Sequence, residues 1–386
     1  MQQNGSREKA WVGTWAAAQQ LVEEHNMPPE PGLANNTLRQ VIRVSLGGEK
    51  IRLKFSNEYG NSPLHIKAAQ LAVARGGSAI DTSSIKEISF GGDKSVSIAP
   101  GEVVVSDTLD YELPGLTTMA ITLYFGEVPA DLTGHPGSRT TSYIMPGKAL
   151  AAREMSTAIC TDHWYIISGL DILSEDPEVA AVVALGDSIT DGRGSTTNGN
   201  DRWTDVLADR LQADSATVKI GVLNQGIGGN RVLRGGLGPT ALSRFERDVL
   251  DQSGVRYLIV FEGVNDIGEE GHEAETAEEL IKAYRLFIEK AHEQDILVYG
   301  ATILPFGGSQ YDNKENEETR LKVNHWIRNS GAFDAVLDFA AAVEDPEEPG
   351  KLYNLYDCGD HLHLSPAGYK KLAETIDLAL FRTENR

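Results

Sequence analysis

The spacing of hydrophobic positions changes once along the chain. From about residue 38 to residue 125, hydrophobic and polar residues alternate, as they do around Ile51, Leu53 and Phe55. A period of two is typical of strands with one buried face, and glycine-containing turns separate these segments. The regular spacing of the turns predicts an all-β sandwich domain, jelly-roll-like in form, over residues 10–175.

A different pattern follows the acidic, proline-containing stretch at 174–178. Helical segments now alternate with short apolar runs, which lie at 181–185, 220–223, 256–261, 296–304 and 335–339. This alternation predicts a parallel sheet covered by helices, and therefore an α/β domain over residues 178–386. One helix is expected to begin at the capping box Thr276–Glu279 and another at Ser365–Pro366.

Composition narrows the classes of partner. The 386 residues include 35 Lys plus Arg and 56 Asp plus Glu, a formal net charge of -21 that would repel nucleic acid and anionic membrane surfaces. No apolar run approaches the roughly 18 to 20 residues that cross a bilayer. Residues 1–9 lack the apolar segment of a signal peptide, so we expect a cytoplasmic chain, or a secreted or periplasmic one whose signal peptide was removed.

The two cysteines, Cys160 and Cys358, are far apart and have no metal-binding spacing. They argue against a zinc ribbon or a disulfide scaffold, although a single bridge between them stays open.

A candidate nucleophile follows the first strand of the α/β domain. Ser188 lies in the turn Gly186-Asp187-Ser188, where a buried strand gives way to a helix. A serine exposed at such a turn acts as a nucleophile when a base takes its proton. By itself the tripeptide also fits a plain turn.

Two further strands are followed by groups that could stabilise an oxyanion. The glycine-rich segment 224–230 lets backbone N–H groups approach a ligand, and Asn265, in Gly263-Val264-Asn265-Asp266, offers a side-chain donor. Taken singly, the first segment fits a glycine turn without a ligand and the second fits an Asx turn.

The candidate base lies in Asp360-His361-Leu362-His363, just before the Ser365 N-cap. The spacing lets Asp360 reach one ring nitrogen of His363 while the other faces a serine. His361 paired with Asp357 is the alternative, and a solvated polar turn is another. A metal site is a third, because Asp-His-x-His brings three ligand types together.

The four segments, in this order, resemble the GDSL/SGNH hydrolase family, whose four blocks carry Ser, Gly, Asn and His. The resemblance implies a flavodoxin-like three-layer α/β/α domain that works through an acyl-enzyme, with no cofactor and no metal. The all-β domain before it resembles the β-sandwich of some two-domain bacterial members.

Roles for single residues follow from this resemblance. It implies Ser188 as nucleophile, His363 as base and Asp360 as the group that orients the base. The oxyanion hole would be the backbone N–H groups of Ser188 and Gly229 with the side chain of Asn265, and Gly228 is the alternative to Gly229.

The expected function is a serine esterase that acts on short-chain acyl esters, acetyl above all, of a small-molecule or carbohydrate alcohol. A lysophospholipase or thioesterase with longer acyl chains is one alternative, and an inactive carbohydrate-binding protein is another. The oligomeric state stays open. The acid limb of the pH profile should follow a histidine near the ordinary pKa of about 6.5, raised by Asp360.

Six further residues have both a structural and a functional interpretation, and the structural one is expected for each. Trp11 and Trp15 are assigned to the core rather than to a sugar-stacking platform. His135 and Tyr143 are assigned to a plain loop rather than to a wall of the site. Arg320 and Asn324, four apart on a helix, are expected to pair locally.

Overall fold

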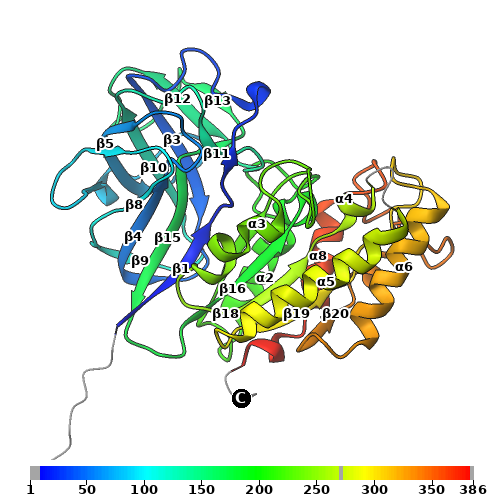
Figure 1. The fold of residues 1–386 in the computed structure, drawn as a ribbon. Helices are drawn as coiled ribbons and strands as arrows, with labels where there is room; N and C mark the ends of the chain where they lie inside the picture. Colours follow the sequence, from blue (N-terminus) through cyan, green and yellow to red (C-terminus); the bar gives the residue numbers. More distant parts are fainter. Residues whose placement is uncertain (1–8, 269–272, 383–386) are drawn as a thin grey trace, which may run out of the picture.

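The computed structural model describes residues 9–268 and 273–382. The first half of the chain is β-rich, and the second half forms an α/β part (Figure 1). The predicted fold class is therefore confirmed. Because β15 ends at Ser174 and β16 begins at Ala180, we keep the boundary between residues 175 and 178 as our proposal.

The strands and short helices of the β-rich part are β1 (Ala10–Ala16), β2 (Gln20–Leu21), η1 (Glu24–Asn26), β3 (Asn36–Arg43), β4 (Gly48–Ser56), β5 (Leu64–Val73), η2 (Thr82–Ser84), β6 (Lys86–Ile88), β7 (Val96–Ile98), β8 (Val103–Val105), β9 (Leu109–Leu113), β10 (Thr118–Phe125), β11 (Thr133–His135), β12 (Ser142–Pro146), β13 (Ile159–Thr161), β14 (Trp164–Tyr165) and β15 (Ile167–Ser174).

These strands form antiparallel sheets. One has the order β1-β15-β4-β8 with β9 also beside β4, and another has the order β13-β12-β3-β10-β5-β6 with β7 also beside β5. A small third sheet, β14-β11-β2, lies at the junction with the α/β part. Along β4, Ile51, Leu53 and Phe55 are buried while the residues between them are partly exposed, as the alternating pattern predicts.

The elements of the α/β part are β16 (Ala180–Gly186), α1 (Ser188–Asp191), α2 (Trp203–Ala213), β17 (Ile220–Gly226), α3 (Ala241–Phe245), η3 (Glu246–Leu250), β18 (Val255–Phe261), α4 (Val264–Ile267), α5 (Glu273–His292), β19 (Leu297–Ala301), α6 (Lys314–Asn329), β20 (Ala335–Leu337), α7 (Phe339–Val343), α8 (Pro366–Thr375) and η4 (Leu378–Phe381).

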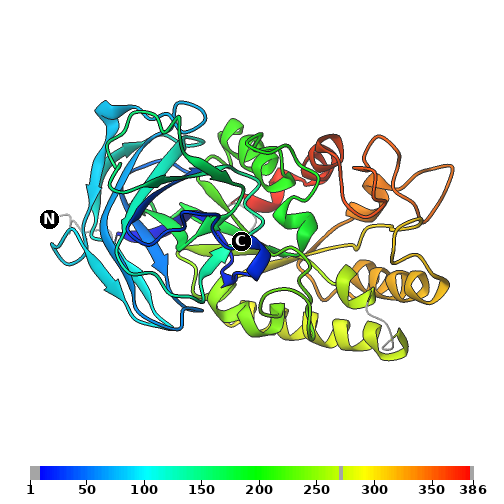
Figure 2. The same ribbon diagram turned by 90° about the horizontal axis from the view of Figure 1, so that it is seen from above.

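Their sheet is parallel and has the order β17-β16-β18-β19-β20, which is the flavodoxin-like order. Figure 2 shows the sheet between α2 and α8 on one side and α5 and α6 on the other. Every residue of β16 is buried, which explains why that strand is a continuous apolar run. Because β16, β17 and β18 are parallel neighbours, the residues that follow their carboxyl ends lie together at the same end of the sheet.

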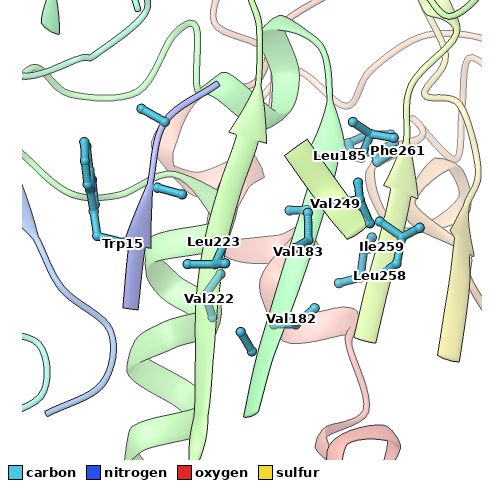
Figure 3. Close-up of a cluster of buried hydrophobic side chains, with 14 of the residues drawn as sticks. Trp15, Val182, Val183, Leu185, Val222, Leu223, Val249, Leu258, Ile259 and Phe261 are labelled. Atoms are coloured by element: carbon cyan, nitrogen blue, oxygen red, sulfur yellow. The ribbon is translucent and has the colours of Figure 1, made fainter. Parts of the chain in front are cut away.

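The two parts share one hydrophobic core. Strand β1 pairs with β15 and also lies against β17, and the backbone N–H of Gly13 donates to the carbonyl oxygen of Ser253 at 2.8 Å. Leu223 of β17 lies against Gly13 of β1, where an added Cβ would be 2.7 Å from its Cδ1, and Figure 3 shows the cluster continuing through Val183 of β16 to Leu258 and Ile259 of β18. The β-rich part is therefore packed directly against the β17 edge of the parallel sheet.

Two local expectations on helix starts have different outcomes. Ser365 caps α8 and accepts from the backbone N–H of Gly368, as predicted. Helix α5 already begins at Glu273, so Thr276 lies inside the helix and the predicted capping box is wrong as a start. Within the described residues, no helix is long and apolar enough to cross a membrane.

The cysteines do not form the bridge that the sequence left open. Cys160 and Cys358 are both free thiols and both exposed.

Candidate active site

The turn after β16 places Ser188 at the first position of α1. Asp187 is the N-cap of this helix and accepts from the backbone N–H of Ile189 at 2.9 Å. Gly186 is required because an added Cβ would lie 2.2 Å from Oγ1 of Thr190. The serine is 6% exposed and its side chain faces a cleft.

The predicted base and its partner lie next to this serine. Oγ of Ser188 is 2.7 Å from Nε2 of His363, and Nδ1 of His363 is 2.7 Å from Oδ2 of Asp360. Because the carboxylate accepts the Nδ1 proton, Nε2 is left to accept from the serine. The other oxygen of Asp360 accepts the backbone N–H groups of Leu362 and His363, at 3.0 and 2.8 Å. The structure thus brings the three residues together in one chain of hydrogen bonds.

The alternative base, His361, lies elsewhere. Its Nδ1 is 2.6 Å from Oδ2 of Asp357, so the alternative pair exists, but its ring is exposed and the serine is held by His363. The two histidines therefore do not converge as metal ligands. Among residues 9–268 and 273–382, a cluster with ligand spacing is formed by Asp357, Cys358 and Asp360, without either ring.

Burial sets the protonation of the base. Burial lowers the pKa of His363 below its ordinary value of 6.5, and this effect exceeds the opposing effect of Asp360. The expectation that the aspartate raises the net value is therefore wrong. Partial burial raises the pKa of Asp360, but its hydrogen bonds from His363 and Leu362 lower it by more, so the carboxylate stays ionised.

We expect the acid limb of kcat/KM to have its midpoint below pH 6.5. Only the neutral imidazole accepts the serine proton, so a lowered histidine pKa extends activity towards acid. Hydrolysis of a neutral ester measured from pH 4 to pH 8 checks this, on a substrate whose own ionisation is constant over that range. A midpoint above pH 6.5 would mean that the buried imidazole is not the titrating group.

The backbone N–H donors of the predicted oxyanion hole, Ser188 and Gly229 with Gly228 as the alternative, belong to residues that line the same cleft. No acceptor within the described residues binds the backbone N–H of Ser188, Gly228 or Gly229. Gly229 has φ +68°, a conformation that favours glycine. Both Gly228 and Gly229 line the cleft, and we propose Gly229 as the donor.

The Asn265 amide is fixed by two hydrogen bonds. Nδ2 donates to the carbonyl oxygen of Asn230 at 2.8 Å, and Oδ1 accepts from the Tyr311 hydroxyl at 3.0 Å. The second N–H of the amide is left for an oxyanion. Tyr311 was missed by the sequence reasoning, because it lies in a loop after β19 with no motif around it.

Arg244 is a second residue that the sequence reasoning missed. Its guanidinium is fully buried and donates to the carbonyl oxygens of Gly186 and Gln225, at 3.0 and 2.6 Å, and to Oδ1 of Asn230 at 3.0 Å. It also pairs with Asp248 at 3.0 Å. This one side chain therefore fixes the ends of the strands that carry Ser188 and the glycine segment.

Three buried carboxyl groups, those of Asp187, Glu262 and Asp266, belong to the segments that carry Ser188 and Asn265. Burial raises the pKa of Glu262 to about 8, that of Asp187 to about 7 and that of Asp266 to about 6. Arg244, 3.5 Å from Glu262, opposes this only in part. Glu262 is therefore protonated in the folded protein at neutral pH.

We expect Glu262→Gln to change how stability depends on pH. The pKa of this carboxyl is 4.5 in the unfolded chain and about 8 in the folded protein, so the wild type loses stability as pH rises between these values. The slope is at most about 1.4 kcal/mol per pH unit. Urea unfolding at pH 5 and pH 8 should show the variant gaining stability relative to the wild type at the higher pH.

Glu293→Gln, at an exposed glutamate, is the matched control and should show no such change between the two pH values. A constant difference between wild type and Glu262→Gln would contradict the raised pKa.

Both parts of the molecule line the cleft. From the α/β part it is lined by Ser188, Asp191, Arg193, Gly228, Gly229, Leu237, Asn265, Gln310, Tyr311, Leu362 and His363; from the β-rich part it is lined by Gln20, Glu23, Asn26, Pro136, Gly137, Arg139 and His163. The first half of the chain thus supplies a wall of the site.

A buried contact holds that wall against the nucleophile helix. Nε2 of His135 is 2.8 Å from Oδ1 of Asp191, the last residue of α1, and Nδ1 of His135 is 2.8 Å from the carbonyl oxygen of Ala18. The expectation of a plain loop is wrong for His135, which is buried in β11, and for Tyr143, which lies in β12. This contact could not be predicted from a local sequence pattern, because His135 and Asp191 are 56 positions apart.

The remaining structural expectations have different outcomes, and the assignment to the core is confirmed for Trp15. Trp15 is 7% exposed and packs edge-on against Trp164, whereas Trp11 is partly exposed beneath the Arg52 guanidinium. Arg320 and Asn324 do not pair with each other, so the expectation of local pairing between them is wrong. Arg320 pairs with Glu317 at 2.6 Å, and Asn324 bonds the backbone of Ile303.

The fold and the site define a class of protein, a carboxylic ester hydrolase. Residues 184–371 match the model of the GDSL-like Lipase/Acylhydrolase family. This match confirms the predicted resemblance over that region, together with the hydrolase class and small-molecule esters as the kind of substrate.

Solved structures similar to the chain cover about half of it. A catalytic mutant of an acetylxylan esterase from Geobacillus stearothermophilus is 22% identical, with TM-score 0.41, over 52% of this chain and 94% of that one. A GDSL-like lipase from Bacteroides thetaiotaomicron is 20% identical, with TM-score 0.39, over 53% and 88%. A lipolytic G-D-S-L family protein from Veillonella parvula is 17% identical, with TM-score 0.39, over 51% and 95%. The search of curated proteins finds no match.

Proposed function

We propose that the protein is a serine esterase that removes short acyl groups, acetyl above all, from a polar alcohol such as a carbohydrate. One observation carries the proposal: Ser188 lies 2.7 Å from Nε2 of His363, whose Nδ1 lies 2.7 Å from Asp360. A nucleophile, a base and a group that orients the base are the parts that acyl transfer needs.

In the first half of the reaction, Oγ of Ser188 attacks the ester carbonyl carbon while Nε2 of His363 takes the hydroxyl proton. The carbonyl oxygen becomes an oxyanion, which accepts from the backbone N–H groups of Ser188 and Gly229 and from the Asn265 amide. The C–O bond to the alcohol then breaks, and the histidine passes its proton to the departing oxygen.

In the second half, a water molecule attacks the acyl-enzyme. His363 takes a proton from the water, and the same donors hold the second oxyanion. The bond to Oγ breaks, the serine regains its proton from the histidine, and the carboxylic acid leaves. Asp360 stays ionised throughout and stabilises the imidazolium.

The lining of the cleft supports a polar alcohol and a short acyl group. The wall from the β-rich part is polar, with Gln20, Glu23 and Asn26 from the segment around η1. Aliphatic side chains in the lining are limited, among the described residues, to Pro136, Leu237 and Leu362. A long acyl chain needs a larger apolar surface than these three residues offer.

A chain-length series tests the proposal. We expect hydrolysis of p-nitrophenyl acetate and butyrate to exceed that of the octanoate and palmitate, with all four rates depending on Ser188. Preference for octanoate or longer would instead favour a lysophospholipase or thioesterase. Equal, negligible rates in wild type and Ser188→Ala would favour an inactive carbohydrate-binding protein.

A further inference from the structure

Two arginines line the cleft beside the nucleophile and the base. Arg139 comes from the β-rich part, between β11 and β12, and has φ +53°. Arg193 lies just after α1 in the α/β part. Within residues 9–268 and 273–382, neither guanidinium donates a hydrogen bond to another residue of the chain, although each carries five N–H donors.

The nearest carboxylates do not satisfy these donors. Nη2 of Arg139 is 3.9 Å from Oδ2 of Asp191, and Nε of Arg193 is 4.0 Å from Oδ2 of Asp360. Both distances exceed that of a hydrogen bond. Asp191 is bound to His135 and Asp360 to His363, so both carboxylates already have partners.

A third carboxylate in the cleft is also occupied. Glu23 accepts from Nε2 of Gln20 at 2.6 Å and from Nδ2 of Asn26 at 3.0 Å. Nε of Arg139 is buried and has no hydrogen-bond partner. Because this Nε is shielded from the cleft, a ligand would be bound by the accessible remainder of the side chain, which is 30% exposed.

Both arginines lie close to the base. Nε of Arg193 is 4.0 Å from the Asp360 carboxylate that binds the His363 ring, and Arg139 lines the same cleft as this ring. His363 is the group that protonates the departing oxygen in the proposed reaction. A substrate group that reaches the guanidinium groups therefore belongs to the alcohol rather than to the acyl chain.

We propose that Arg139 and Arg193 form an anion subsite that binds a carboxylate or phosphate group carried by the alcohol of the ester. This inference rests on the proposed function. The planar guanidinium binds such groups through two parallel hydrogen bonds. Because the net charge of -21 repels polyanions, the subsite takes a small substrate with a single anionic group, such as an acetylated uronic acid.

The test compares a mono-acetylated galacturonic acid with the mono-acetylated galactose that lacks only the carboxylate. We expect the wild type to prefer the acid by about ten- to a hundredfold in kcat/KM, the effect of a charge-assisted hydrogen bond. Arg139→Gln and Arg193→Gln should each move this ratio towards one. Arg75→Gln, at an arginine of the β-rich part outside the cleft lining, should leave it unchanged.

A second pair of substrates, an acetylated sugar phosphate and its neutral parent, separates the two sources of charge. A larger ratio for the phosphate pair assigns the subsite to phosphate, and a larger ratio for the galacturonate pair assigns it to carboxylate. Ratios near one for both pairs would overturn the inference.

A binding experiment separates this inference from the proposed function. Calorimetric titration of the Ser188→Ala variant with galacturonate, galactose and a galactose phosphate needs no turnover. Tighter binding of either anionic sugar, weakened by Arg139→Gln, supports the subsite even if the wild type hydrolyses no ester. Equal affinity for all three sugars overturns the subsite and leaves the esterase proposal untouched.

Discussion

Ser188→Ala is expected to lower kcat by about a million-fold, the loss seen when the nucleophile of a comparable triad is removed. The variant keeps the fold, because the turn depends on the Asp187 cap and on Gly186 rather than on the hydroxyl. It loses the atom that forms the acyl-enzyme, so residual hydrolysis comes only from binding and from the oxyanion donors. Hydrolysis of p-nitrophenyl acetate measures the loss of kcat, and urea unfolding of the same variant checks that the fold is kept.

Ser195→Ala is the matched control for this change. Ser195 follows α1 in the same loop, and its buried hydroxyl has no hydrogen-bond partner among the described residues. Its removal should leave kcat close to that of the wild type. If the two variants kept similar activity, Ser188 would not be the nucleophile.

His363→Ala is expected to cost nearly as much as loss of the serine, because the residues of a triad act as a unit. His361→Ala is the internal control: this ring is two residues away and bound to Asp357, but it is exposed and does not contact Ser188. Its loss should change kcat by less than about threefold, within the range of surface substitutions. Equal damage from the two variants would make the assignment of the base wrong.

Asp360→Ala should leave more activity than either of these variants. The aspartate orients the imidazole and stabilises its charged form but takes no part in bond making. Measuring kcat for all three variants on one ester gives the order that the triad requires.

The α/β part was largely predictable because its periodicity is strong. The apolar runs at 181–185, 220–223 and 256–261 became β16, β17 and β18, each with chemistry at its carboxyl end. Parallel strands that are covered by helices on both faces are short, continuous apolar runs, and these three segments have that pattern. The site residues could be named for the same reason, since each followed a strand or preceded a helix.

The features of the site that could not be predicted depend on contacts between segments far apart in the sequence. A buried arginine such as Arg244 resembles a surface residue in sequence, because its acceptors are backbone oxygens of other strands. The contact between His135 and Asp191, and the wall that the β-rich part supplies, arise from packing of β1 against β17. The direction of the His363 pKa shift also required the degree of burial, which local sequence does not fix.

Labelling with a fluorophosphonate tests the central claim most directly, because this reagent forms a bond to an activated serine oxygen with loss of fluoride. Peptide mapping should find one modified residue per wild-type chain, Ser188, with no labelling of Ser188→Ala and slow labelling of His363→Ala. An unlabelled wild type, or labelling of another residue that persists in Ser188→Ala, would contradict the account of Ser188 as the nucleophile.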